Sequence, residues 1–307
     1  MIHYSSCPVC SGPDLTDLLA VKDHTVSQKF FSIWHCNACT LRFTQDAPSV
    51  EEMGPYYQSE NYISHTDINR GLINRLYHIV RKLTLSSKRR LIMSRTGLAK
   101  GNILDIGCGT GAFLHTMKNT GWKITGLEPD ALAMQKAQEL YGIMPLPSDD
   151  LNKLVPGTYD AITMWHVLEH VHELSSYMKA VYGLLKADGK LFIAVPNYTS
   201  YDAGVYRENW AAWDVPRHLY HFSPLSMKQL IRSNGLQLDT VRAMWFDSFY
   251  VSLLSEKYIN GSGNIFRACW NGLVSNLKAM NDKETCSSVI YIISKAGQVK
   301  LPNEVKQ

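Results

Sequence analysis

Two cysteine pairs with the same spacing stand near the start of the chain, and their thiolates are ligands that suit zinc. Each pair, Cys7 with Cys10 and Cys36 with Cys39, has two residues between its cysteines. Two thiolates at this spacing can bind one ion, and a second pair completes a tetrahedral site. A redox dithiol or four buried cysteines would not explain the repeated spacing. The pattern predicts a structural zinc site made of Cys7, Cys10, Cys36 and Cys39.

A glycine-rich segment follows an apolar run at residues 103–111. Gly107, Gly109 and Gly111 let the backbone approach a ligand closely and take conformations closed to other residues. Glu128 stands near the end of the next predicted strand, where a carboxylate can accept hydrogen bonds from ribose hydroxyls. These residues predict a nucleoside-binding site.

Two cofactor classes fit this glycine segment. Its spacing, Gly107-x-Gly109-x-x-Ala112 with Glu128 further on, also satisfies the loose dinucleotide fingerprint. Asp105 favours the other class, because a carboxylate at the strand tip suits the ammonium group of an amino-acid ligand and would repel a pyrophosphate. We therefore expect a cofactor that joins a nucleoside to an amino acid.

Over residues 102–197 the chain resembles the class I S-adenosylmethionine-dependent methyltransferases. Four ordered motifs carry the resemblance: LDIGCGTG at 104–111, GLEPD at 126–130, YDAITMWHVLEHV at 159–171 and LKADGKLFI at 185–193. The resemblance implies S-adenosylmethionine as cofactor, with Asp150, or less favourably Asp149, near the adenine amino group. The cofactor-binding residues that it implies are Asp105, Gly107, Cys108, Gly109, Gly111, Glu128, Pro129, Asp150, Leu151 and Trp165.

The third motif also contains the pattern His166-x-x-Glu169-His170, which is known from inverted zinc peptidases. The methyltransferase resemblance explains it better, as the loop at the methyl end of the cofactor site. We therefore interpret His166 as a candidate catalytic residue of the pocket wall and not as a zinc ligand. Glu169 and His170 can equally cap the next helix.

Aromatic and polar residues are dense at 210–223, after the predicted fifth strand. In open α/β sheets, ligands bind at the edge formed by the carboxyl ends of the strands, which is where this segment begins. His218 or His221 can take a proton from a methyl acceptor, and Arg217 can hold an anionic group. The alternative is a structural loop in which the histidines cap a helix and Arg217 pairs with Asp214.

The cysteine module, the methyltransferase core and the extra C-terminal region together resemble the antibiotic-sugar C-methyltransferases. His218 and Ser223 match the histidine and serine of that family's aromatic stretch, but Arg217 stands where the family has a glutamate. The resemblance therefore supports the architecture more than the acceptor.

Short apolar strands alternate with amphipathic helices from residue 102 onward, which is typical of an α/β fold with a parallel sheet. Together with this pattern, the methyltransferase resemblance implies a Rossmann-like seven-stranded sheet whose last two strands form an antiparallel pair, with a small N-terminal zinc-ribbon module and a helical insertion before the last strand. The expected divisions are a module at 1–47, a helical linker at 48–98, the cofactor-binding core at 99–244, a helical lid at 245–286, and a last core strand with a tail at 287–307.

The composition of the chain argues against several classes of protein. Hydrophobic residues make up 45% and charged residues 19% of the 307 residues, as in ordinary globular proteins. A net charge of +4 is smaller than a dedicated nucleic-acid binder needs. No apolar run spans a bilayer and no signal peptide is visible, so we expect a cytoplasmic protein without a membrane span.

The sequence therefore predicts methyl transfer to a small-molecule acceptor (a sugar, lipid or other metabolite), by in-line displacement with base assistance. Two alternatives stay open. One is an RNA methyltransferase that uses the zinc module and the basic residues between Arg81 and Arg95. The other is a protein that binds the cofactor without catalysis. The sequence leaves open whether 245–286 is a lid or a surface for homo-oligomer formation.

Overall fold

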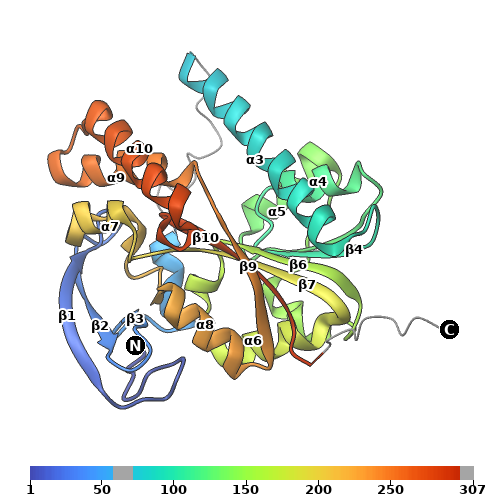
Figure 1. Ribbon diagram of the computed structural model, residues 1–307, viewed down its shortest axis with the longest axis horizontal. Coiled ribbons are helices and arrows are strands. Elements are labelled where there is room, and N and C mark those ends of the chain that lie inside the picture. The colour runs from blue at the N-terminus through green and yellow to red at the C-terminus, as the bar shows by residue number, and fades with distance from the viewer. Residues whose placement is uncertain (58–71, 298–307) are drawn as a thin grey trace.

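A mixed sheet forms the centre of the protein (Figure 1). The computed structural model describes residues 1–57 and 72–297. Four neighbouring strands are parallel, and β10 runs antiparallel to both β7 and β9. The predicted antiparallel final pair is confirmed. The order is β5 (Lys123–Leu127), β4 (Asn102–Ile106), β6 (Tyr159–Trp165), β7 (Leu185–Pro196), β10 (Ser288–Lys295) and β9 (Leu236–Ala243).

Within the described residues this sheet has six strands where the sequence predicted seven. The place beside β5 is taken by one isolated parallel bridge, between Leu127 and Leu146. Leu146 stands between Pro145 and Pro147, which have no N–H groups to donate. A regular ladder cannot extend along this segment, so the seventh strand is reduced to a single bridge.

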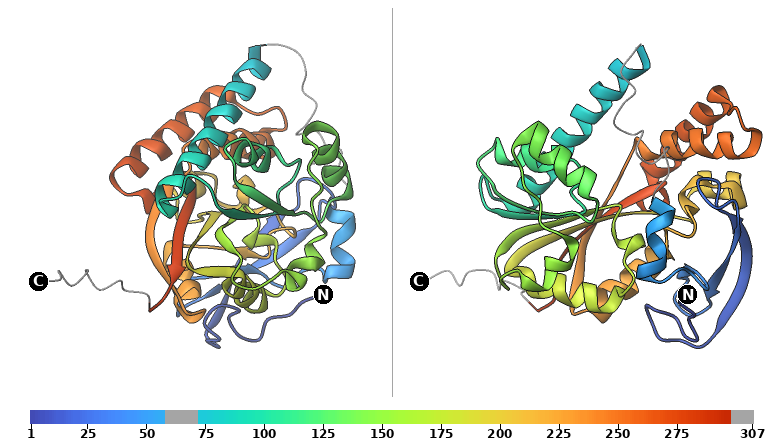
Figure 2. Two further views of the ribbon diagram at one scale, coloured as in Figure 1. Left: turned by 90° about the vertical axis from the view of Figure 1, so that its right-hand side faces the viewer. Right: turned by 180° about the vertical axis from the view of Figure 1, so that it is seen from behind.

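Helices cover both faces of the sheet (Figures 1 and 2). Successive side chains of a strand point to opposite faces, so Ile103 packs in one core cluster and Leu104 in the other. One face is covered by α3 (Leu72–Thr96), α4 (Ala112–Lys118) and α5 (Ala131–Tyr141). The other face is covered by α6 (Leu174–Leu184) and α8 (Pro224–Ser233). The predicted α/β fold is confirmed.

The N-terminal module forms a second sheet that takes one strand from the core. Arg42 pairs with His221 and Phe43 with Tyr220. Phe43 is fully buried in the same core cluster as Phe222. The module predicted at 1–47 is therefore continuous with the core in packing. Its sheet order is β1 (Leu15–Lys22), β2 (Phe30–Cys36), β3 (Arg42–Thr44) and β8 (Tyr220–His221).

Short helices and one helical insertion complete the fold. The predicted insertion consists of α9 (Asp247–Asn260) and α10 (Ile265–Asn281), between β9 and β10. Part of the predicted linker, 58–71, and the tail 298–307 lie outside the described residues. None of the helices in the described part of the chain is long and apolar enough to cross a bilayer. The short helices are α1 (Val50–Met53), η1 (Gly54–Tyr57), η3 (Ser148–Lys153), η4 (Leu168–His170), α7 (Tyr201–Tyr206), η5 (Arg207–Asn209), η6 (Ala211–Trp213) and η7 (Lys283–Thr285).

Candidate functional site

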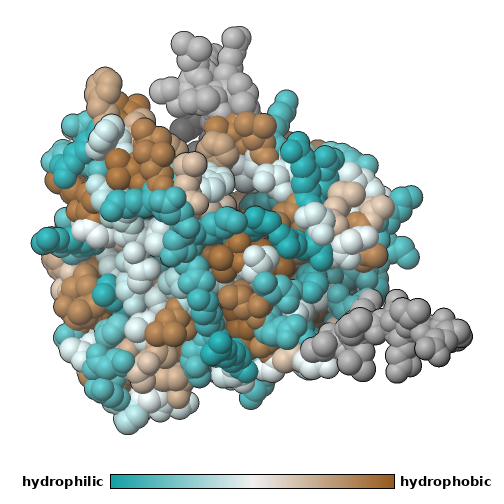
Figure 3. All heavy atoms as spheres, in the orientation of Figure 1, coloured by the Kyte–Doolittle hydropathy of each residue, from teal (hydrophilic) through white to brown (hydrophobic). Residues whose placement is uncertain are grey.

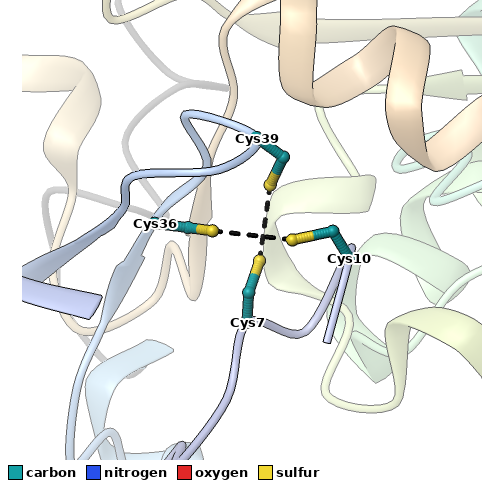
Figure 4. A group of neighbouring side chains, drawn as sticks. All are labelled: Cys7, Cys10, Cys36 and Cys39. Atoms are coloured by element: carbon teal, nitrogen blue, oxygen red, sulfur yellow. Dashed lines mark hydrogen bonds between the residues drawn. The ribbon is translucent and has the colours of Figure 1, made fainter. Parts of the chain in front are cut away.

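The four predicted zinc ligands converge on one point (Figure 4). The sulfur atoms of Cys7, Cys10, Cys36 and Cys39 all lie within 4.8 Å of one another. Cys7 Sγ is 3.4 Å from Cys39 Sγ, and Cys10 Sγ is 3.5 Å from Cys36 Sγ. These separations exceed a disulfide bond of about 2.05 Å and approach the sulfur–sulfur spacing around a tetrahedral ion with Zn–S distances of about 2.3 Å. The donor set therefore fits a closed zinc site.

The glycine loop joins β4 to α4 at the carboxyl edge of the sheet. Gly107, Gly109 and Gly111 all have positive φ angles, of 68°, 54° and 76°. A β-carbon on Gly107 would lie 2.5 Å from Val167 Cγ2, whereas one on Gly109 would have no atom within 4 Å. The loop is therefore packed against the core at Gly107 and open at Gly109, where the backbone can face a ligand.

Replacing Gly107 by alanine is expected to destabilise the protein beyond the cost of its backbone conformation. A left-handed residue with a side chain costs roughly 1–2 kcal/mol, and the contact with Val167 adds an overpacking cost of about 1–3 kcal/mol. Gly142→Ala is the matched control, because Gly142 has a φ of 59° and no atom within 4 Å of its β-carbon position. Equal midpoints of the two variants in urea denaturation would contradict the packing argument.

Glu128 lies at the end of β5 and forms hydrogen bonds with the glycine loop. Its carboxylate accepts hydrogen bonds from the backbone N–H of Gly109, at 2.6 Å, and of Asp130, at 3.0 Å. Burial raises the pKa of Glu128, and the two N–H groups oppose that rise. A carboxylate has more acceptor sites than these two bonds use. Glu128 can therefore hold the loop and still accept hydrogen bonds from ligand hydroxyls.

Asp105 ends β4 as a buried carboxylate with 1% of its surface exposed. Thr163 Oγ1 donates a hydrogen bond of 2.6 Å to Asp105 Oδ1. Burial raises the pKa of Asp105 to about 7, against the opposing effects of Thr163 and the ammonium group of Lys88. A carboxylate in this environment favours a cationic partner.

Lys88 belongs to this site, and sequence reasoning placed it only within a basic run. It reaches the carboxyl edge from α3, with Nζ 4.2 Å from the centre of the Trp165 ring. Burial lowers the pKa of Lys88, while Asp105 and Asp247 act in the opposite direction. The buried Trp165 Nε1 has no hydrogen-bond partner among the described residues. A cation, a carboxylate and an indole N–H thus meet at one end of the glycine loop.

The other predicted cofactor residues surround the same edge. Glu128 N donates to Leu146 O at 2.9 Å, which places the following helix, η3, beside the end of β5. On η3, Leu151 is buried and Asp150 is partly exposed, with Lys153 Nζ 2.7 Å from its carboxylate. Cys108 is buried within the loop, and Pro129 is exposed beside Glu128.

His166 lies directly after β6 and is held between two carboxylates. Its Nε2 is 2.8 Å from Asp247 Oδ2 and its Nδ1 is 3.4 Å from Glu169 Oε1. Burial opposes its charged form, but Asp247 and then Glu169 outweigh burial and raise the pKa of His166 to about 10. His166 is therefore an imidazolium at neutral pH. It supplies positive charge to the pocket and has no lone pair for accepting a proton.

His218 lies nearby, with its Nδ1 2.8 Å from the carbonyl oxygen of Ala212. A carbonyl only accepts, so Nδ1 donates to it, and in the neutral form of the ring Nε2 would be the acceptor atom. Nε2 is 3.7 Å from Asp214 Oδ2. The ring centres of His218 and His170 are 4.6 Å apart.

Arg217 does not face a free anionic site. It is 4% exposed and donates to both carboxylate oxygens of Asp214 and to the carbonyl of Tyr56. The structure shows the predicted alternative, in which Arg217 pairs with Asp214. Its guanidinium is thus occupied by a carboxylate three residues away, which favours this structural alternative over the anion-holding one.

Glu169 lies at the centre of these histidines and is fully buried. Ligand atoms of Glu169, His170 and His218 lie within 4.8 Å of one another, and the Glu169 carboxylate has no hydrogen-bond partner among the described residues. Its charge faces the His166 imidazolium. Burial and then His218 lower the pKa of His170 to about 4. The cluster thus holds the buried Glu169 carboxylate beside His166, His170 and His218.

His221 is placed differently from His218. It lies in β8, opposite Arg42 of the N-terminal sheet, and is 4% exposed. Its Nε2 is 3.2 Å from Thr44 Oγ1, and its ring packs edge-on against Trp213. Burial, then His218 and Arg42, hold its pKa well below the ordinary value. His221 thus lies where the N-terminal sheet meets the core, with its ring centre 6.4 Å from that of His218.

The chain is similar in sequence to known methyltransferases. The sequence profile of a family described as "Methyltransferase domain" matches residues 78–241, more than half of the chain. A ubiquinone biosynthesis O-methyltransferase of Xanthomonas euvesicatoria pv. vesicatoria is 28% identical over 171 residues, which are 51% of this chain and 71% of that protein. The mitochondrial ubiquinone biosynthesis O-methyltransferase of Bos taurus is 29% identical over 163 residues, 48% of this chain and 44% of that protein.

The chain is also similar to solved structures. One, described as a SAM dependent methyltransferase from Archaeoglobus fulgidus, has 21% sequence identity and a TM-score of 0.48, and the match covers 70% of this chain and 94% of that chain. The matched family region contains the glycine loop, Lys88, Glu128 and the histidine cluster, while the four cysteines and α9–α10 lie outside it. The chain belongs to the methyltransferase-domain family and is a class I S-adenosylmethionine-dependent methyltransferase.

Proposed function

We propose that this chain binds S-adenosylmethionine at the carboxyl edge of β4 and β5 and transfers its methyl group to a hydroxyl oxygen of a small molecule. The observation that carries the proposal is the convergence of Asp105, Glu128 and the open glycine loop at that edge, inside the region that matches the family. The cofactor supplies an activated methyl group on a sulfonium. The protein's work is then alignment, exclusion of water and proton removal.

The buried charges suit the two ends of this cofactor. Asp105 would face the ammonium group of the methionine part, and Lys88 would face its carboxylate, which relieves both groups of an unmatched buried charge. Glu128 would accept hydrogen bonds from the ribose hydroxyls. Asp150 and Leu151 would lie beside the adenine, because η3 is fastened to the end of β5.

His218 is the proposed base. Its Nδ1–H donates to the Ala212 carbonyl, which orients the ring, and in the neutral ring Nε2 would accept the proton. The imidazolium formed would lie near the carboxylates of Asp214 and Glu169, which stabilise it. The His166 imidazolium would favour an acceptor oxygen that is becoming negative.

An oxygen acceptor is supported by the names of the curated relatives, which are O-methyltransferases. Sugar C-methylation is less well supported, since Arg217 is buried against Asp214 and offers no carboxylate base at that position. The RNA alternative rests on the cations of α3. It is less well supported, because one of these cations, Lys88, lies over the Trp165 ring and would face the cofactor.

An acceptor screen tests this proposal. The zinc-replete protein would be incubated with S-adenosylmethionine and, in separate reactions, with phenols, nucleotide sugars or RNA, and release of S-adenosylhomocysteine would be measured. We expect turnover with a hydroxylated small molecule, at a rate above that of the His218→Asn variant. Turnover with RNA alone would replace the proposed acceptor, and cofactor binding without turnover on any class would favour the non-catalytic alternative.

We also propose that the four cysteines hold zinc with a structural role. Four thiolates fill a tetrahedral ion's coordination sphere, so the site has no open position for substrate. Its contribution would be to fix β3, on which β8 and the His218 loop are built. Thiolate ligands also support a reducing location such as the cytoplasm.

A further inference from the structure

The helical insertion is polar on its inner face. Ser275 Oγ donates to Asp202 Oδ1 at 2.7 Å, and Asn271 Nδ2 donates to Tyr206 OH at 2.9 Å. Ser255 Oγ accepts from the backbone N–H of Ala211 at 2.9 Å. Soluble proteins normally turn the apolar face of a surface helix toward the core. Here the buried residues of α10 are all polar or small, and those of α9 are three serines and Glu256 beside the apolar Val251.

The large apolar side chains of the insertion point outward. On α10 they recur every three or four residues, so they form one stripe along the whole helix. Phe266 is 85% exposed, Trp270 64% and Met280 67%. On α9, Leu253 and Ile259 are exposed too. Figure 3 shows brown side chains gathered where Figure 1 places α9 and α10. We call this surface the apolar hairpin face; it comprises Tyr250, Leu253, Ile259, Phe266, Trp270, Leu273, Leu277 and Met280.

The exposure of this face is fixed by packing. A β-carbon on Gly272 would lie 2.7 Å from Phe249 Cδ1, so α9 and α10 touch closely at this glycine. The buried Asp202 also accepts hydrogen bonds from Trp210 Nε1 and Ser287 Oγ, which ties α10 to the core. The hairpin therefore cannot rotate its apolar face inward without leaving several buried polar groups unpaired.

The charges around the face are positive. The exposed charged residues of α9 and α10 are Lys257, Arg267 and Lys278, and no acidic residue occurs between Ile265 and Asn281. At about 100° per residue, Arg267 and Lys278 lie on the same edge of α10, beside the apolar stripe. The acidic Glu256 is fully buried, with its Oε1 3.2 Å from Arg267 Nε. An apolar stripe edged by cations is the pattern of a helix that lies in the interface of an anionic membrane.

We propose that the apolar hairpin face docks on the surface of an anionic lipid bilayer. The aromatic and aliphatic side chains would enter the acyl boundary, and the edge cations would meet lipid phosphates. In all views α3, which carries the exposed Lys82 and Arg90, rises from the same side of the sheet as α9 and α10 (Figures 1 and 2). A second copy of the chain fits this face less well, because it would bring cations of the same kind against Lys257 and Lys278.

Vesicle co-sedimentation of the full, zinc-replete chain tests the proposal. We expect binding to vesicles of phosphatidylcholine mixed with phosphatidylglycerol, at least about ten-fold stronger than to phosphatidylcholine alone, and weaker at high salt. The double variant Phe266→Ser/Trp270→Ser should lose this binding by at least about ten-fold. Lys257→Glu/Lys278→Glu should lose the preference for anionic vesicles.

Matched controls distinguish binding by the apolar hairpin face from nonspecific binding by other exposed apolar or basic residues. Leu140→Ser/Leu225→Ser removes two exposed apolar side chains on α5 and α8, and Lys118→Glu reverses an exposed cation on α4. Both controls should bind vesicles like the unchanged protein. Three results would overturn the proposal. The first is equal vesicle binding by Phe266→Ser/Trp270→Ser and the unchanged protein, and the second is no binding to either kind of vesicle. The third is a dimer in sedimentation velocity that Phe266→Ser/Trp270→Ser dissociates, with no vesicle binding.

Discussion

Replacing Cys36 by serine is expected to lower the melting temperature of the whole protein by roughly 10 °C or more. Structural zinc in small modules binds with a free energy on the order of 10 kcal/mol, and a loss of 1 kcal/mol lowers the melting temperature of a domain of this size by about 2–4 °C. The effect reaches the core because β3 pairs with β8 and because Phe43 shares a hydrophobic cluster with Phe222. Removal of zinc by a strong chelator should have the same effect.

Differential scanning calorimetry together with measurement of bound metal checks this result. Cys269→Ser is the matched control, since Cys269 is exposed on α10 and outside the four-cysteine cluster. It should retain one zinc per chain and an unchanged melting temperature. A Cys36→Ser protein that melts normally, or an unchanged protein that binds no zinc, would contradict the structural role proposed for the metal.

Replacing His218 by asparagine is expected to lower kcat by about 10²–10⁴-fold while leaving the affinity for the cofactor nearly unchanged. His218 Nε2 is the proposed proton acceptor, and His218 is not part of the glycine loop or of its hydrogen bond to Glu128. Asparagine can keep a hydrogen bond to the Ala212 carbonyl, so the loss should reflect proton transfer and not a collapsed loop.

Steady-state kinetics with the acceptor found by screening measure this effect. His221→Asn should lose stability more than kcat, because His221 lies in β8 against Thr44 and Trp213. His3→Ala, at an exposed site, should change neither quantity. If His221→Asn lost kcat while keeping its melting temperature, and His218→Asn did not lose kcat, then the two roles would have to be exchanged.

The sequence predicted the centre of this fold and much of the cofactor site because both follow local rules. Short apolar strands alternating with helices are predicted from residue 102 onward, and the structure confirms this pattern in the parallel strands β4, β5, β6 and β7. The glycine segment is a local conformational requirement, which the positive φ angles of Gly107, Gly109 and Gly111 bear out. The seventh strand was predicted from the family pattern, and the two prolines around Leu146 limit it to one bridge.

What the sequence did not predict depends on contacts between distant segments. Lys88 looked like one cation of a solvated helix face, but α3 carries it to Asp105 and Trp165. Asp247 meets His166 only because the insertion returns over the end of β6. A strand of two residues, such as β8, has too few residues to show a period.

The sequence also does not show which side of an amphipathic helix faces the core. The apolar spacing within α9, as in Leu253, Leu254, Tyr258 and Ile259, predicts a helix that packs these residues on one side. The structure divides this group: Leu254 and Tyr258 pack beside the cluster around Trp213, while Leu253 and Ile259 are exposed. Only the position of the polar partners, such as Asp202 and Tyr206, decides which side faces the core.

The central claim is that the glycine loop, Asp105 and Glu128 form a site for S-adenosylmethionine, and calorimetric titration tests it most directly. The purified, zinc-replete protein would be titrated with S-adenosylmethionine and, separately, with NAD(H), and the titrations repeated for Asp105→Ala and Glu128→Ala. We predict tight binding of S-adenosylmethionine that is lost in both variants, and no binding of NAD(H). Binding of NAD(H) in its place, or S-adenosylmethionine affinity unchanged in both variants, would contradict the account.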